Sequence, residues 1–201
     1  MRARSASRII GIDVDIKRWL ACVPSVEETR PNSCPQCGAA SCAAGGALGL
    51  HGHGLRERQL RGPLEPGGEP MLVSLWVRRF LCTSCGATMT VGPKVLRARR
   101  LFSTAVIAFA LALWAVAELT ASAVRAAVSP LRETGAASAR TWLTLRRWAA
   151  DAQSLFSVVR PSPESWPPRK VAERVACSVA SLAPGPGAIP YRAFAGAERD
   201  G

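Results

Sequence analysis

The sequence has few of the residue groups on which most enzymes depend. It contains only two histidines, no combination of Ser, His and acidic residues that would support hydrolysis, and no glycine-rich phosphate loop. Asp13 and Asp15 stand close together, but no further acidic cluster accompanies them, so surface positions are expected and not a two-metal catalytic pair. With 201 residues the chain can form one ordinary domain or two small ones. We therefore expect no enzyme activity, and any catalytic partner would be a separate chain.

Long hydrophobic segments are also scarce. The basic residues 1–8 are followed by an apolar stretch that ends at Asp13, too early for a secretory leader, so a cytoplasmic location is expected. The longest charge-free run, residues 101–117, has 17 residues, the lower limit for crossing a bilayer. Its large side chains recur at helical spacing, which favours packing against other helices: Phe102, Val106, Phe109, Leu113 and Val116. Arginines precede the run, as the positive-inside rule requires, so a membrane anchor over 101–117 stays open as an alternative.

Acidic residues are few compared with basic ones. The chain has 14 Asp and Glu against 26 Lys and Arg, and its formal net charge is +12. The charge is +2 over residues 1–33, +6 over 34–100, +3 over 101–160 and +1 over 161–201. This concentration suits a surface that binds a polyanion. Nucleic acid is the first candidate and an anionic membrane surface the second.

The cysteines carry the most specific pattern in the chain. Among seven cysteines, two pairs have the form Cys-x-x-Cys-Gly, namely Cys34 with Cys37 and Cys82 with Cys85. Two intervening residues let one tight turn present both thiolates to an ion, and the glycine after each pair can adopt the positive φ that such a turn needs. The spacing predicts a closed, structural Zn²⁺ site with these four ligands. Cys42 is a less favoured substitute ligand, while Cys22 and Cys177 are expected to be buried as small hydrophobes.

A β-hairpin is expected between the two cysteine pairs. Residues 49–60 are predicted to form its first strand, 63–70 the turn and 71–80 the returning strand. His51 and His53 fall on one face of the first strand, where a phosphate contact or a place in the core is more plausible than redundant zinc ligation.

The run from Cys34 to Pro93 resembles a known family. It combines Cys-Pro-x-Cys-Gly, the His-Gly-His-Gly-Leu-Arg-Glu-Arg segment, a Gly-Gly turn and the ending Arg-Arg-Phe-Leu-Cys. The pattern is similar to the zinc-ribbon head of ISL-type insertion-sequence transposases, and closer to short bacterial proteins that join such a ribbon to a helix-turn-helix. The resemblance covers roughly residues 31–150 and implies DNA recognition. In the transposases a catalytic domain with acidic metal ligands follows, whereas this chain continues into a proline-rich segment.

A helix-turn-helix is expected after the ribbon. Residues 120–128 would form the bracing helix, and a long helix over 136–159 would enter the major groove. Trp142, Leu145 and Ala149 would anchor that helix to the core. The residues expected to face DNA are Arg140, Thr141, Thr144 and Arg147. The alternative interpretation is an ordinary amphipathic helix with solvated arginines.

Further arginines are expected to contact phosphates without reading sequence. They are Arg56, Arg58 and Arg61 on the first strand, Arg78 and Arg79 on the second, and Arg97, Arg99 and Arg100 in the link that follows.

These expectations give an α+β protein with four segments: an N-terminal extension (1–30), a zinc ribbon (31–93), a helix-turn-helix-like domain (94–160) and a proline-rich tail (161–201). Within the tail, one helix over 171–182 stays open. The expected partner is double-stranded DNA, bound in the nucleoid by the chain alone, as a homodimer or with a transposase or recombinase chain. No small-molecule substrate is expected. The alternatives are a transposase-related subunit that acts with a separate catalytic chain, and a zinc-ribbon protein anchored in the inner membrane.

Overall fold

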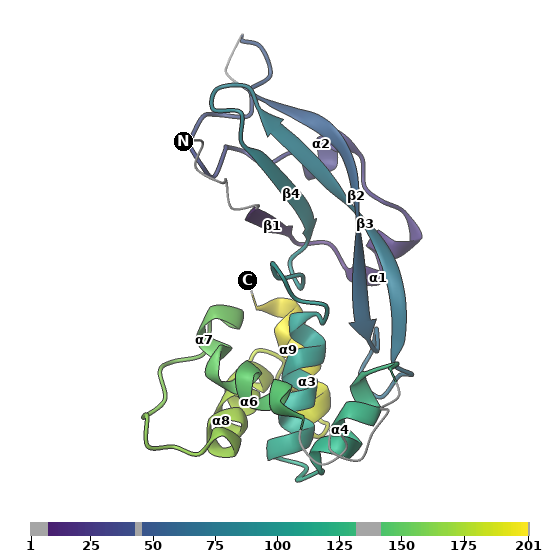
Figure 1. The fold of residues 1–201 in the computed structure, drawn as a ribbon, viewed down its shortest axis with the longest axis vertical. Coiled ribbons are helices and arrows are strands. Elements are labelled where there is room, and N and C mark those ends of the chain that lie inside the picture. The colour runs from purple at the N-terminus through teal and green to yellow at the C-terminus, as the bar shows by residue number, and fades with distance from the viewer. Residues whose placement is uncertain (1–7, 43–45, 132–141, 201) are drawn as a thin grey trace. The chain divides into compact units, whose positions relative to one another are not determined.

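The computed structural model describes residues 8–42, 46–131 and 142–200 (Figure 1). It confirms the α+β class, with a four-stranded sheet and a set of helices. The chain forms two compact units, one made of Met1–Gln59 and Ser74–Arg100, the other of Leu60–Val73 and Leu101–Gly201.

The first unit is built on a sheet with the strand order β1-β4-β3-β2. The predicted hairpin is confirmed as β2 (Leu50–Gly62) and β3 (Met71–Cys82), whose far end, Leu60–Val73, belongs to the second unit. Strand β4 (Thr88–Pro93) pairs antiparallel with β3, and β1 (Arg8–Ile12) pairs in parallel with β4. Strand β1 of the N-terminal segment thus belongs to the same sheet as the hairpin.

A short helix, α1 (Ile16–Ala21), continues from β1 and covers part of the sheet. The side chain of Asp15 caps it by accepting hydrogen bonds from the first backbone N–H groups of the helix. Trp19 is fully buried, and its indole Nε1 donates to the backbone oxygen of Trp76 in β3 at 2.8 Å. Asp13 pairs with Lys94 at 3.0 Å. Both aspartates of this segment therefore have structural partners.

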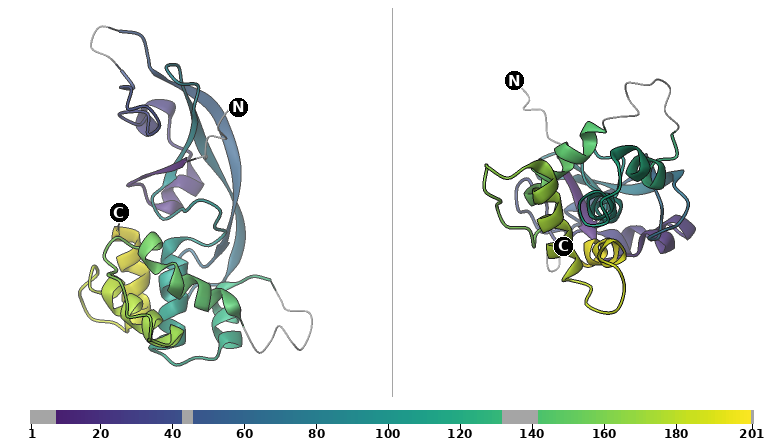
Figure 2. Two further views of the ribbon diagram at one scale, coloured as in Figure 1. Left: turned by 60° about the vertical axis from the view of Figure 1, so that its left-hand side comes forward. Right: turned by 90° about the horizontal axis from the view of Figure 1, so that it is seen from below.

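The second unit surrounds one central helix, α3 (Thr104–Ala115), capped by Ser103. Every residue from Thr104 to Ala112 is buried, so the helix has no solvent-facing stripe. Around it lie α4 (Ala121–Val128), α6 (Leu143–Ala150), α8 (Pro168–Ala180) and α9 (Ile189–Arg199), as two views show (Figures 1 and 2). The prediction that the 101–117 run packs against helices is confirmed. None of the described helices combines the length and the apolar character needed to span a bilayer.

The predicted long helix over 136–159 differs from the structure. Residues 132–141 lie outside the described part, and the following segment forms two short helices, α6 and then α7 (Ala152–Leu155), joined at Asp151. Ser154 donates to the carbonyl oxygen of Asp151 through both its backbone N–H and its hydroxyl, which closes a local turn in place of a continuing helix. Phe156 is then extended, with φ −130° and ψ 124°, so the helical face ends there.

The segment 161–201, predicted as a proline-rich tail in which residues 171–182 could be helical, contains two helices in the structure. Helices α8 and α9 lie in this range, and their apolar faces belong to the same core as α3. Pro168 and Pro190 stand in the first turn of their helices, where a missing N–H costs nothing and the fixed φ favours the helical start. Prolines that suggested an irregular tail therefore start helices.

Replacing Asp200 with alanine should destabilise the second unit. This side chain is 4% exposed, and its carboxylate accepts hydrogen bonds from Ser157 N, Ser157 Oγ and Val158 N. Removing it leaves those donors without a partner, so the free energy of unfolding should fall by about 2–3 kcal/mol, measured by denaturant titration. Glu173→Ala, which removes an exposed acid from α8, should change it by less than about 0.5 kcal/mol. An equal effect of both variants would contradict this role for Asp200.

Candidate metal centre and basic turn

The four predicted cysteine ligands come together at one end of the sheet. All ligand sulfurs of Cys34, Cys37, Cys82 and Cys85 lie within 4.8 Å of one another. The Sγ atoms of Cys34 and Cys85 are 3.8 Å apart, as are those of Cys37 and Cys82. Cys34 and Cys82 are buried, while Cys37 and Cys85 are exposed. This arrangement can hold a metal ion.

Two matching backbone turns present these sulfurs. In the first, Cys34 N donates to Ala39 O at 2.9 Å and Gly38 N donates to Cys34 O at 2.8 Å. The second repeats both bonds, with Cys82 N donating to Ala87 O and Gly86 N to Cys82 O, each at 2.9 Å. Gly38 and Gly86 have φ values of 73° and 70°, which confirms the expected need for glycine.

A third glycine ties the two turns together. The carbonyl oxygen of Gly49 accepts hydrogen bonds from Thr83 N at 3.0 Å and Thr83 Oγ1 at 3.2 Å. A Cβ at position 49 would overlap the carbonyl oxygen of Ala40, so only glycine allows this approach. The segment that leads into β2 is thereby fixed to the second cysteine pair. No signal in the sequence around Gly49 predicts this role.

The thiols in the cluster differ in acidity. Burial opposes ionisation of Cys82, but backbone N–H groups of Ser84 and Cys85 donate to its sulfur and bring its pKa down to about 7. For Cys85 the N–H of Ala87 lowers the pKa, yet burial and the neighbouring cysteine sulfurs raise it to about 12. Hydrogen bonds from the backbone thus favour the thiolate at Cys82, whereas the neighbouring sulfurs oppose it at Cys85. A cation is needed before all four sulfurs can be thiolates.

Arg30 packs against the small core that contains Cys34 and Cys82, a role that was not predicted. Its guanidinium bonds to both carboxylate oxygens of Glu27, donates to the carbonyl oxygen of Leu50 and lies 5.9 Å from the ring centroid of Phe80. Only 8% of its side chain is exposed. Arg30 thus joins helix α2 (Val26–Thr29) to the start of β2, and no local pattern distinguishes it from the surface arginines.

A second feature of the first unit is a turn that gathers positive charge. The Nη2 atom of Arg58 donates to the carbonyl oxygens of Arg97 and Arg100, each at 3.1 Å, and so closes residues 97–100. Arg99, within this turn, has φ 61°, a value that non-glycine residues rarely adopt. Burial and the nearby charge of Arg56 lower the pKa of Arg58. We call Arg58 together with residues 97–100 the basic turn.

The other residues predicted to contact DNA differ in their surroundings: some bond to the backbone, some are buried and some are exposed. Arg78 donates from Nε to Pro24 O at 2.8 Å and holds the chain beside α2, while Arg79 is half-buried. Arg61 belongs to the second unit, where its Nε is buried and has no hydrogen-bond partner among the described residues. Arg56, Arg99 and Arg147 are exposed, and Thr144 is half-buried. Arg140 and Thr141 lie outside the described residues.

The remaining candidate ligands stay away from the metal cluster. Cys42 is exposed and is not part of the four-sulfur group. Cys22 and Cys177 are also exposed, so the expectation that they are buried hydrophobes is wrong. Both His51 and His53 are exposed, so neither lies in the core.

Comparison with family models, with curated proteins and with solved structures finds no match for this chain.

Proposed function

We propose that the chain is a non-catalytic, double-stranded DNA-binding protein whose first unit is a zinc ribbon. The metal follows from the donor set, because four thiolates select zinc among the common divalent ions and form closed, structural sites. A tetrahedron with zinc–sulfur bonds of about 2.3 Å has edges of roughly 3.8 Å. Two of the sulfur–sulfur separations have this value, 3.8 Å. The residues present therefore fit zinc.

The distribution of charge supports a polyanionic partner for this unit. Its 14 basic and 5 acidic residues give a net charge of +9, whereas the second unit, with 12 basic and 9 acidic residues, has +3. No acidic residue occurs between Glu69 and Glu118. The unit that holds the four cysteines is thus the one that a phosphate backbone would attract.

The basic turn is the observation that carries the proposal. Four arginines are held on or against one short turn, and Arg58 is fixed there by its bonds to the backbone. Like charges brought this close repel one another, and burial adds to the cost for Arg58. Phosphate groups would relieve that repulsion and release counterions on binding. Arg99, exposed in its left-handed conformation, would be a direct phosphate contact.

Helix α6 would add a second contact region. Its buried residues Leu145, Trp148 and Ala149 fix it to the core, while Arg146 and Arg147 are exposed on its other side. We propose that α6 is the DNA-reading helix and α4 the bracing helix, with Arg147 directed at DNA and Leu145 and Ala149 as the anchors that the sequence predicts.

Changing Arg99 to glutamine should weaken duplex binding by roughly three- to tenfold at low salt. Because one phosphate contact is lost, the slope of log affinity against log salt should fall by about one unit, with little dependence on DNA sequence. The measurement is fluorescence anisotropy with a labelled duplex across a salt series. Arg18→Gln, which removes the same charge from α1, serves as the control. Equal losses in both variants would show that only total charge matters and would refute a phosphate site at the basic turn.

A further inference from the structure

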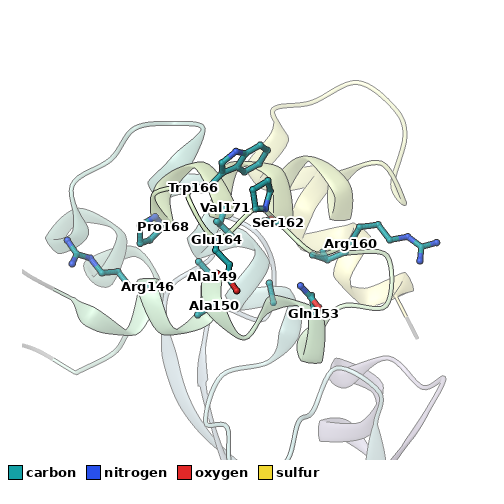
Figure 3. Close-up of a pocket in the computed structure, with 13 residues that line it drawn as sticks. Arg146, Ala149, Ala150, Gln153, Arg160, Ser162, Glu164, Trp166, Pro168 and Val171 are labelled. Carbon is teal, nitrogen blue, oxygen red and sulfur yellow. The ribbon is translucent and has the colours of Figure 1, made fainter.

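The second unit contains a pocket next to the proposed DNA contact of α6, whose Arg146 lines it. Its volume is about 330 Å³, within the range of small-molecule sites. It lies between α6, α7, the segment 159–166 and the start of α8 (Figure 3). All of these elements belong to one unit, so the pocket is a property of that unit alone.

The inner surface of the pocket is apolar and one wall is aromatic. Ala149, Ala152 and Val159 are buried and line it, and the Trp166 ring forms part of its wall. Two cations of α8 approach that ring, with Lys170 Nζ 4.4 Å and Arg174 Cζ 5.6 Å from its centroid. An indole beside a shallow alanine floor suits a flat, apolar ring, because stacking needs area and no particular hydrogen bond.

Polar side chains in the same pocket are placed to read the edge of such a ring. Glu164 points toward Ala149 and Ala150, with Gln153 beside them, in the close-up (Figure 3). Within the described chain, neither Glu164 nor Gln153 has a side-chain hydrogen bond. A carboxylate accepts from N–H donors and an amide both donates and accepts, which are the groups that recognise the edge of a nucleobase.

Positive charge stands at both ends of the pocket. Arg146 on α6 and Arg160 on the following segment line it from opposite sides, and their guanidinium groups point outward in the close-up (Figure 3). A free aromatic acid would need cations at one point only. Two cations flanking a flat site suit a chain whose anionic groups lie on both sides of its ring, which is the structure of a nucleotide within a strand.

We propose that this pocket binds an unpaired nucleotide, with the base against Trp166 and the alanine floor and with phosphates at Arg146 and Arg160. Because Glu164 accepts hydrogen bonds, a base that carries an amino group, such as cytosine, is preferred to thymine. The inference deepens the proposed function, since the unpaired nucleotide would come from a DNA site that the protein already binds. A free nucleotide has the same chemistry, and the test separates the two sources.

The test uses the zinc-loaded full chain and three labelled duplexes: a perfect duplex, the same duplex with one bulged cytidine, and one with a bulged thymidine. Wild-type protein should bind the cytidine bulge roughly five- to tenfold more tightly than the perfect duplex. Trp166→Ala should abolish that preference and leave binding of the perfect duplex unchanged. Glu164→Gln should remove the preference for cytidine over thymidine. Tyr191→Ala removes an exposed aromatic side chain of this unit that does not line the pocket, and should change nothing.

The outcomes separate this inference from the proposed function. If the protein binds all three duplexes equally, or if Trp166→Ala behaves like Tyr191→Ala, the pocket proposal is overturned while duplex binding stands. If no duplex binds, the proposed DNA-binding function fails. Binding of cytidine monophosphate then tests whether the pocket is a nucleotide site. Trp166-dependent binding of that nucleotide would support a site for a free nucleotide, and its absence would overturn the inference.

Discussion

Replacing Cys82 with serine should remove the bound metal and unfold the first unit. Cys82 is fully buried, and its backbone and sulfur both take part in the second cysteine turn. Structural zinc contributes about 10–16 kcal/mol of apparent binding free energy in small zinc domains, as much as the whole stability of a typical domain. The core around this site is small, with Leu50, Phe80 and Met89 as its large buried members. Without the metal it should not hold the sheet together.

Metal content and hydrogen exchange together measure this effect. Elemental analysis should find about one zinc per wild-type chain and little in the Cys82→Ser variant, because a closed site needs all four thiolates. Exchange protection should be lost across β2, β3 and β4 and retained in α3 and α8, which have their own core. DNA affinity should fall with it, since the basic turn is held by Arg58 of β2.

The matched control is Cys42→Ser, which removes an exposed thiol outside the cluster. It should keep its zinc and its exchange protection. If Cys42→Ser loses as much metal as Cys82→Ser, the ligand assignment is wrong. A wild-type protein that binds no zinc would refute the metal proposal itself.

The features predicted correctly from the sequence are those fixed by local chemistry. The four cysteines and the two glycines form turns whose geometry depends on residues within five positions, so spacing was enough to predict them. The β2–β3 hairpin is likewise local, with alternation and a turn between its strands. The pairing of β1 with β4 joins segments about 80 residues apart, and no pattern within either strand indicates it.

The role of an arginine could not be predicted from its residue type alone. Arg30, Arg78 and Arg58 bond to carbonyl oxygens of distant segments, whereas Arg56 and Arg99 are exposed. A guanidinium satisfies a carbonyl oxygen as well as a phosphate, so sequence alone cannot assign one role or the other. In the second unit, Arg169 and Arg192 donate to carbonyl oxygens at the ends of α3 and α8. Their structural role could not be predicted for the same reason.

Replacing Gly196 with alanine should strongly destabilise the second unit. A Cβ at this position in α9 would overlap the carbonyl oxygen of Val179 in α8 and lie 2.9 Å from its carbonyl carbon. Alanine is the better helix former by roughly 1 kcal/mol, but the clash is with backbone and forces the two helices apart. We expect a net loss of about 2–3 kcal/mol, read as a fall in the melting temperature of the second unit on the order of 10 °C.

Two further variants test whether the instability of Gly196→Ala comes from a clash with the backbone of α8 or from crowding between side chains. Val179→Ala combined with Gly196→Ala should not restore stability, because the overlapping atom is the carbonyl oxygen, which truncation of the valine side chain leaves in place. At the preceding position, Ala195→Gly should also destabilise, by about 1 kcal/mol, since glycine is the poorer helix former. Rescue by Val179→Ala would place the strain in side chains instead. Position 195 would thus be more stable with alanine and position 196 with glycine, because only position 196 lies where α9 meets the backbone of α8.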